Sequence, residues 1–307
     1  MSGDVVVVSP PSDELLALAL SRPREALATA RAVLSQPVSA AVAAVAHQAA
    51  GIVLRDFGDI VEALREFRAG IRCARRAGDA ERTADIRAAY GVALVMSGRP
   101  AAGLEQIDAA AAGASGLAAG RIQIRKAHAL QLLGRYAEML RAAQAAVSLL
   151  GRTGDLDWQA RAFHHRATAS LGLGAVGRAD ADYARAERLF EQAGQHLESA
   201  STLHDRAVVV FARGDLPRAL ALLDEAQAVI EELGVFEPEL YFTRVQVLLA
   251  AELSRDALHV ADAAVARSIR QHGSATRRIP VRCAGWPIRV AGCFARPLRR
   301  RRATHRG

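Results

Sequence analysis

The sequence predicts an all-α protein, a right-handed solenoid of about seven helix hairpins followed by an irregular basic tail. Three observations lead to this fold class. Over the 307 residues, 51% are hydrophobic and only 5% aromatic, which favours a stacked array of alanine-rich helices. One glycine recurs at a nearly constant interval between helical patterns, and small residues recur at constant distances from it.

The recurring glycines mark the middle of each predicted hairpin. A first helix is expected to end near the glycine, which tolerates the left-handed backbone of a tight exit, and a second helix to begin a few residues later. Pro100 and Pro217 lie where the second helix begins, a position where a missing N–H is harmless. The glycines, 36–40 residues apart, are Gly58, Gly98, Gly134, Gly174 and Gly214.

Weaker copies of the pattern extend the array at both ends. Ser21 takes the glycine position in a first unit and Glu252 takes it in a last one, which makes seven units over residues 13–267. Small residues seven before and five after each glycine are expected to let the two helices of a hairpin approach closely. Larger side chains are expected to fill the seam between them: Leu54, Leu94, Leu130, Val210 and Leu248.

This register resembles the tetratricopeptide repeat (TPR). The resemblance rests on the spacing from the glycine to the following small residue, the small residue seven before it, and an aromatic nine after it at Phe67 and Tyr183. Two features depart from that family. The units have 36–40 residues rather than about 34, and other residues replace the early tryptophan. The resemblance implies a solenoid that binds another protein or a peptide.

Residues 203–226, "LHDRAVVVFARGDLPRALALLDEA", resemble the amino-terminal repeats of actinobacterial CHAT (caspase-like) proteins. That resemblance implies the sensor or scaffold half of such a protein, without its peptidase domain. A sensor domain of a transcription or signalling regulator is the alternative. The sequence has no Walker loop, no GxGxxG after a strand and no GxSxG, so we expect neither an enzyme nor a cofactor.

The run His164-His165-Arg166 raises the question of a metal or catalytic site. Adjacent residues on a helix point about 100° apart, so the two histidines cannot chelate one ion together. A helical zinc pair needs a partner four residues on, and neither histidine has one. The run also repeats forty residues later as His204-Asp205-Arg206. We therefore interpret it as part of the repeat surface and expect no metal site.

In stacked hairpins the first helices line the concave face of the superhelix. The middle of this face is predicted to be basic, which suits an acidic peptide or a carboxylate terminus bound by arginine forks. An ordinary solvated face is the alternative for these residues. The candidate groove residues are Arg55, Arg121, His128, Gln131, Arg161, His164, His204, Phe211, Phe242 and Gln246.

The end of the chain differs from everything before it. Residues 263–307 hold twelve arginines and no acid, so of the net charge of +8 the preceding 262 residues carry 8 − 12 = −4. Three interpretations of residues 268–307 remain open: an anion or nucleic-acid binder through Arg299, Arg300, Arg301 and Arg302, a native disordered extension, or out-of-frame translation.

Beyond this tail, the predicted domains are a disordered start, residues 1–12, and the repeat array, residues 13–267. The start lacks the basic region of a signal peptide, and the uncharged residues 32–54 contain Pro37, His47 and two glutamines. A membrane span is therefore not expected. The three cysteines form no CxxC pair, which fits a reducing cytoplasm.

Overall fold

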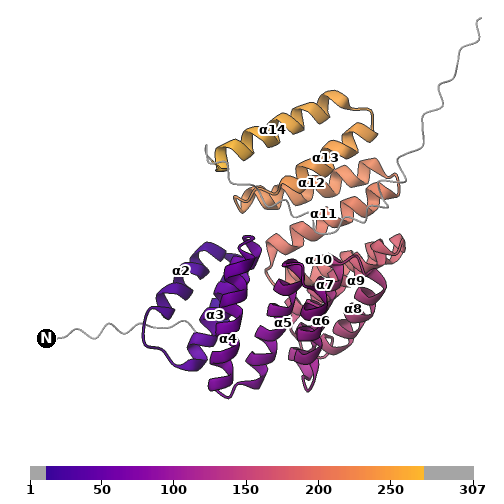
Figure 1. Cartoon of the computed structure of the whole chain (residues 1–307). Helices are drawn as coiled ribbons and strands as arrows, with labels where there is room; N and C mark the ends of the chain where they lie inside the picture. Colours follow the sequence, from indigo (N-terminus) through magenta and orange to yellow (C-terminus); the bar gives the residue numbers. More distant parts are fainter. Residues whose placement is uncertain (1–11, 273–307) are drawn as a thin grey trace, which may run out of the picture.

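The computed structural model describes residues 12–272, and these residues form helices and turns with no strand. Consecutive helices pair as antiparallel hairpins, and the hairpins stack in chain order (Figure 1). The first helices are α1 (Ser12–Ser21), α3 (Ala40–Asp56), α5 (Ala80–Met96), α7 (Gly116–Leu132), α9 (Leu156–Gly172), α11 (His196–Ala212) and α13 (Pro238–Ala250). The second helices are α2 (Pro23–Leu34), α4 (Ile60–Arg76), α6 (Pro100–Ala111), α8 (Tyr136–Leu150), α10 (Val176–Gln192), α12 (Leu216–Glu232) and α14 (Ser254–His272).

This architecture confirms the predicted α-solenoid of seven hairpins. The last helix continues to His272, five residues beyond the predicted end of the array at 267. The basic tail from residue 273 onward, with Arg299, Arg300, Arg301 and Arg302, lies outside the described residues, as does nearly all of the predicted N-terminal segment. In the described part of the chain, no helix is both long enough and apolar enough to cross a membrane.

The recurring glycine builds the inner turn in five of the seven hairpins. Gly58 has a φ of +85°, and its N–H donates to the Arg55 carbonyl while the next N–H, of Asp59, donates to Leu54. These two bonds end the first helix in the way that a left-handed residue permits. The Asp59 side chain then accepts from the Glu62 N–H and caps the second helix. A glycine followed by aspartate thus ends one helix and begins the next.

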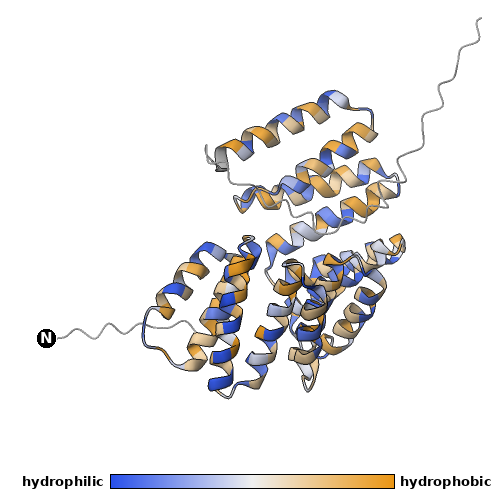
Figure 2. Cartoon of the chain, in the orientation of Figure 1, coloured by the Kyte–Doolittle hydropathy of each residue, from blue (hydrophilic) through white to orange (hydrophobic). Residues whose placement is uncertain are grey.

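The core lies between the paired helices and between successive hairpins. In every hairpin with a glycine turn, the small residues predicted to permit close approach are buried. The backbones of α5 and α6 approach closely, since a Cβ added to Gly103 would lie 2.5 Å from the Gly91 carbonyl oxygen. The predicted seam residues are also buried: Leu54, Leu94, Leu130, Val210 and Leu248. Each helix carries both hydrophobic and hydrophilic positions, as its two faces require (Figure 2).

Candidate functional site

A cavity of about 300 Å³ lies on the concave face of the superhelix. The first helices of five hairpins, α1, α3, α5, α7 and α9, contribute to its wall together with Gln195 in the turn before α11. Its apolar lining comes from Leu16, Ala17, Ile52, Ile124 and Trp158. Its polar lining comes from Gln48, Arg55, Asp85, Arg121, Arg125, His128, Asp157, Arg161, His165 and Gln195. A second hollow, of about 390 Å³, opens beside the start of α5 and is lined by five alanines together with Arg75, Gly78, Asp79, Thr83 and Arg87.

A buried ion pair forms one side of this cavity. Arg125 Nη1 on α7 lies 2.5 Å from Asp85 Oδ1 on α5, and Gln48 Nε2 on α3 donates to the other carboxylate oxygen at 2.5 Å. Burial opposes ionisation of Asp85, but Arg125 and Gln48 outweigh it and hold the pKa of the carboxyl below its usual value. Asp85 is therefore ionised, and it ties three successive first helices together.

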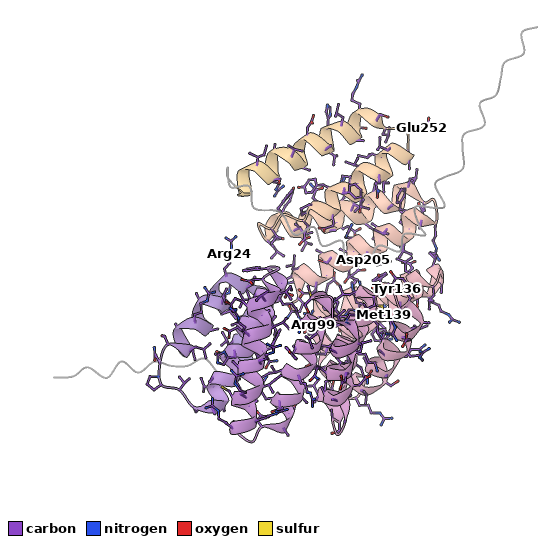
Figure 3. The ribbon with its side chains drawn as sticks, in the orientation of Figure 1. Arg24, Arg99, Tyr136, Met139, Asp205 and Glu252 are labelled. Atoms are coloured by element: carbon purple, nitrogen blue, oxygen red, sulfur yellow. The ribbon has the colours of Figure 1, made fainter. Side chains whose placement is uncertain are left out.

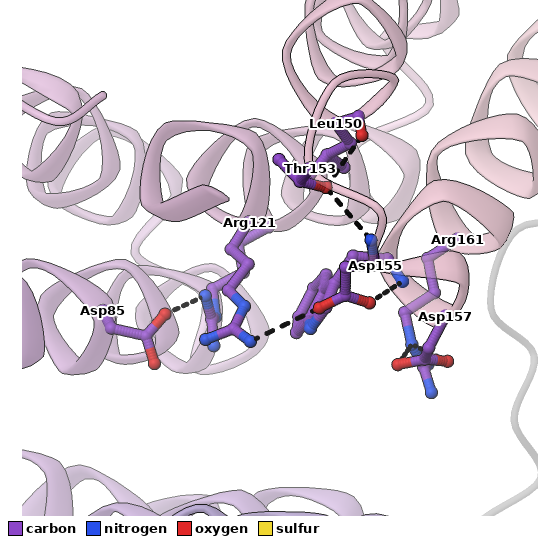
Figure 4. Close-up of polar contacts among 9 residues, drawn as sticks. Asp85, Arg121, Leu150, Thr153, Asp155, Asp157 and Arg161 are labelled. Atoms are coloured by element: carbon purple, nitrogen blue, oxygen red, sulfur yellow. Dashed lines mark hydrogen bonds and ion pairs between the residues drawn. The ribbon is translucent and has the colours of Figure 1, made fainter. Parts of the chain in front are cut away.

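The start of α9 forms the opposite side. The Asp155 carboxylate caps this helix by accepting from the Trp158 N–H at 3.1 Å. Two residues later, Asp157 accepts from Arg161 Nε at 3.1 Å, and Arg161 Nη2 also donates to Glu198 of α11 at 2.9 Å. Figure 4 shows Asp85, Arg121, Asp155 and Arg161 following one another across this part of the molecule.

Three arginines surround the Trp158 indole. Their Cζ atoms lie 5.1 Å (Arg121), 5.6 Å (Arg125) and 5.8 Å (Arg161) from the ring centroid, within the range of cation–π attraction. The indole is partly buried, and each of the three guanidiniums is attracted to its π system. Trp158 therefore organises the cationic part of the cavity.

Histidines line the wall between α7 and α9. The rings of His128 and His165 are stacked with centroids 6.1 Å apart, and His164 meets His165 edge-on at 5.8 Å. Burial, together with the neighbouring His164, His128 and Arg161, holds the pKa of His165 well below its usual value. His165 is therefore neutral, and its buried Nδ1 has no hydrogen-bond partner.

A second polar group lies further along the concave face, between α9 and α13. His164 Nε2 is 3.4 Å from Asp205 Oδ2, and His204 Nε2 lies 2.8 Å from Thr243 Oγ1. Burial raises the pKa of the Asp205 carboxyl to about 7 and lowers those of His164, where Arg161 contributes, and His204 to about 4. Asp205 is labelled in Figure 3. Within residues 12–272 no three His, Cys, Asp or Glu side chains are grouped to hold a metal ion.

The structure brings four of the ten predicted groove residues into the cavity wall: Arg55, Arg121, His128 and Arg161. The other six lie elsewhere along the first helices. His164 and His204 belong to the polar group just described, and Phe211 is 7% exposed in the core shared with α12. Phe242 is exposed on α13, while Gln131 and Gln246 are half-buried.

Sequence reasoning did not select Gln48, Asp85, Arg125, Trp158 or His165 for the groove. Two of these carried a signal in the repeat register. Asp85 lies thirteen residues before Gly98, the same position that Arg121 holds before Gly134 and Arg161 before Gly174. Gln48 likewise lies ten residues before Gly58, as His164 does before Gly174. The register thus indicated that both positions face the groove, but Asp85 and Gln48 were not selected at them.

Comparison with known proteins gives structural neighbours only. The sequence matches no protein-family model and no curated protein. Among solved structures, the chain is similar to BtubC (BKLC) from P. vanneervenii, with a TM-score of 0.59 and 17% identity over 73% of this chain and 94% of that one. It is similar to PilF of Pseudomonas aeruginosa, with a TM-score of 0.52 and 17% identity over 76% and 93%.

A third neighbour is a Rap protein solved in complex with Competence and Sporulation Factor. Its TM-score is 0.59 at 10% identity, over 88% of each chain. At identities this low the likeness shows the fold alone. The chain therefore has a TPR-like α-solenoid fold, in agreement with the resemblance found in its repeats.

Proposed function

We propose that this chain is a non-enzymatic scaffold or sensor that binds another protein or a peptide in its concave groove. One observation carries the proposal: five successive first helices, far apart in sequence, converge on a single cavity of about 300 Å³ that has both apolar and charged walls. Binding sites of this mixed character anchor an apolar group while a few polar atoms fix its orientation. A groove made by stacked hairpins also exposes many positions to one extended ligand.

The structural neighbours support this proposal in general terms. One of them is a Rap protein complexed with Competence and Sporulation Factor, so a solenoid of this fold forms a complex with a separate factor. The concave face of the present chain offers a surface on which a ligand of this kind could lie.

A randomised peptide library tests the proposal. The full chain is incubated with displayed hexapeptides, and enrichment is compared with that for Ala17→Trp, whose indole would occupy the cavity from α1. Ala28→Trp is the matched control, because Ala28 is exposed on α2 and does not line the cavity. We expect enrichment with the wild type and Ala28→Trp, and its loss with Ala17→Trp. Equal enrichment by all three proteins, or none by the wild type, would overturn the proposal.

The finer part of the proposal is that the array is the regulatory half of a CHAT-type protein with an acidic partner. The repeats of residues 203–226 support the first point, and Arg121 and Arg161 in the cavity wall support the second. Reading the gene through codon 268 in all three frames tests the relationship. A continuing frame with further alanine-rich helices and then a caspase-like His and Cys would support the relationship to CHAT-type proteins. The absence of such a frame would refute that relationship.

Two other functions predicted from the sequence remain proposals of lower rank. A sensor domain of a regulator would use the same groove, with a transcription or signalling factor as its partner. An anion binder would use Arg299, Arg300, Arg301 and Arg302 in the tail. Salt-dependent DNA binding that disappears when residues 268–307 are removed would support the tail function, and binding retained by the truncated chain would exclude it.

A further inference from the structure

Arg121 is the cavity arginine whose hydrogen bonds are incomplete. Four arginines line the cavity, and three of them have a carboxylate within 3.1 Å: Arg55 with Asp56, Arg125 with Asp85, and Arg161 with Asp157 and Glu198. Arg121 has only Asp155, with its Nη2 at 3.8 Å from Oδ2, and its buried Nε has no partner. A guanidinium has five N–H donors, and leaving a buried one without an acceptor is unfavourable.

Asp155 is held away from Arg121 by its role in the fold. Its carboxylate caps α9 through the Trp158 N–H, and its own N–H donates to Thr153 Oγ1 at 3.4 Å. Thr153 Oγ1 in turn donates to the Leu150 carbonyl at 2.8 Å (Figure 4). The cap uses Oδ1, so the helix terminus holds the carboxylate in place while its Oδ2 faces Arg121 at 3.8 Å. The gap at Arg121 is therefore a stable feature of this turn.

The orientation of Arg121 is also set by the structure. The Cζ atom of Arg121 lies 5.1 Å from the centroid of the Trp158 ring, and this cation–π contact helps to hold the guanidinium in the cavity wall. The hydrogen-bond donors of a guanidinium lie in its plane, where a carboxylate can accept two of them. His165 of the same cavity wall is neutral, and its Nδ1 is, with Arg121 Nε, one of the two buried side-chain atoms of the lining residues that have no partner.

The charges of the wall limit the ligand to one negative group. The other three arginines that line the cavity have a carboxylate within 3.1 Å, whereas the Asp155 carboxylate lies 3.8 Å from Arg121, so Arg121 is the one of the four with no carboxylate at hydrogen-bond distance. A phosphate or a cluster of acidic side chains would bring a second negative charge near Asp85, Asp155 and Asp157, which would repel it. The apolar side of the cavity, from Leu16, Ile52 and Ile124, is suited to a hydrocarbon group attached to the single acid.

We propose that this cavity binds a single carboxylate attached to an apolar group, with Arg121 as its principal hydrogen-bond donor. This inference rests on the proposed peptide-binding function and narrows it from an acidic partner to a singly charged one. The carboxylate can come from one residue of a peptide or from a small organic acid, and the two sources share the same chemistry.

The test uses the full chain and the hexapeptide library of the preceding subsection, displayed with free or amidated ends. Arg121→Met removes the donor, and Arg152→Met is the matched control because Arg152 is exposed and outside the cavity. Asp155→Ser is the third variant: serine keeps a helix cap while the competing charge is lost. Circular dichroism establishes that each variant is folded. The small-acid source is tested with isovalerate and inorganic phosphate, followed by Trp158 fluorescence in a Trp286→Phe background.

We expect the enriched peptides to carry one carboxylate beside an apolar residue. Arg121→Met should weaken their binding roughly 10- to 100-fold, as the loss of a charged hydrogen bond predicts. Asp155→Ser should tighten binding, because Arg121 then has no competing carboxylate. Quenching of Trp158 fluorescence by isovalerate but not by phosphate would show that a small organic acid is sufficient for binding. If neither compound changes the fluorescence, the source of the carboxylate is a peptide.

The inference is overturned if enriched peptides are polyacidic or uncharged, if phosphate binds better than the carboxylates, or if Arg121→Met binds like Arg152→Met. Tighter binding must also accompany Asp155→Ser, since a merely structural Arg121 would give unchanged or weaker binding. Enrichment that is blocked by Ala17→Trp but insensitive to Arg121→Met would retain the groove function and reject only the single-carboxylate ligand. No enrichment by the wild type would reject the groove function itself.

Discussion

Replacing Glu252 with glycine should stabilise the last hairpin. Glu252, labelled in Figure 3, is the one residue other than glycine with a positive φ, 62°, within residues 12–272, and its backbone hydrogen bonds end α13 in the same way that those at Gly214 end α11. Its N–H donates to the Leu249 carbonyl at 3.1 Å, and the next N–H, of Leu253, donates to Leu248 at 2.9 Å. The side chain therefore occupies a backbone conformation that glycine adopts without strain.

The expected gain follows from two opposing terms. A side chain in the left-handed region costs about 1–2 kcal/mol, and glycine loses about 0.5–1 kcal/mol more conformational entropy on folding. The net gain for Glu252→Gly is about 0.5–1 kcal/mol, or about 1–4 °C in Tm. Glu252→Ala keeps the strain while removing the charge, so it should leave stability nearly unchanged.

Thermal unfolding by circular dichroism and amide hydrogen exchange in α13 and α14 measure the effect. Exchange is informative because stacked hairpins open locally from their ends. The reverse substitution, Gly214→Ala, should cost a similar amount, since an added Cβ there meets nothing within 4 Å and the backbone effect stands alone. If Glu252→Gly were no more stable than Glu252→Ala, the strain argument would be wrong.

Three further substitutions probe packing and charge. Gly103→Ala should destabilise by about 1–2 kcal/mol in urea unfolding, because its Cβ would meet the Gly91 carbonyl oxygen at 2.5 Å; a stabilised variant would contradict the close approach. Asp85→Asn should cost about 3 kcal/mol in the same assay, since it leaves Arg125 buried without its counter-charge; a loss below about 1 kcal/mol would contradict this. The Asp205 carboxyl has a pKa of about 7, above the value of 3.8 expected when unfolded, so its stabilising contribution is present below pH 4 and lost as pH rises through 7. Asp205→Asn should therefore raise the free energy of unfolding by about 1–2 kcal/mol at pH 8, after allowing for 35% exposure of the side chain, and leave it unchanged at pH 4. Equal effects at the two pH values would refute this prediction.

The fold could be predicted because the residues that specify each hairpin turn lie close together in the sequence. A hairpin turn depends on residues within a few positions of one another, so Gly58 and Asp59 signal both the end of one helix and the start of the next. The same register identified Glu252 as the equivalent of a glycine although its residue type gave no hint of it. The number of hairpins and the burial of their small residues followed from that register.

The candidate site could be predicted only in part, because its contacts are set by the curvature of the superhelix. Leu16 of α1 and Gln195 before α11 line the same cavity although nearly 180 positions separate them in the sequence. The rotation between successive hairpins accumulates along the array, and the angle of this rotation cannot be derived from the spacing of the repeats. The register placed Arg121 and Arg161 on the concave face but could not show which helices would face each other across it.

The charges of the site were harder to infer, because one acidic residue can serve both the fold and the groove. Asp155 follows a turn glycine and caps α9, which its sequence context predicts. The same constraint holds its carboxylate 3.8 Å from Arg121 and leaves that arginine incompletely bonded. A count of charges in the sequence suggests a basic groove, whereas three of its four arginines are paired with nearby acids. The capacity to bind one carboxylate thus arises from a helix cap whose position is set by the backbone.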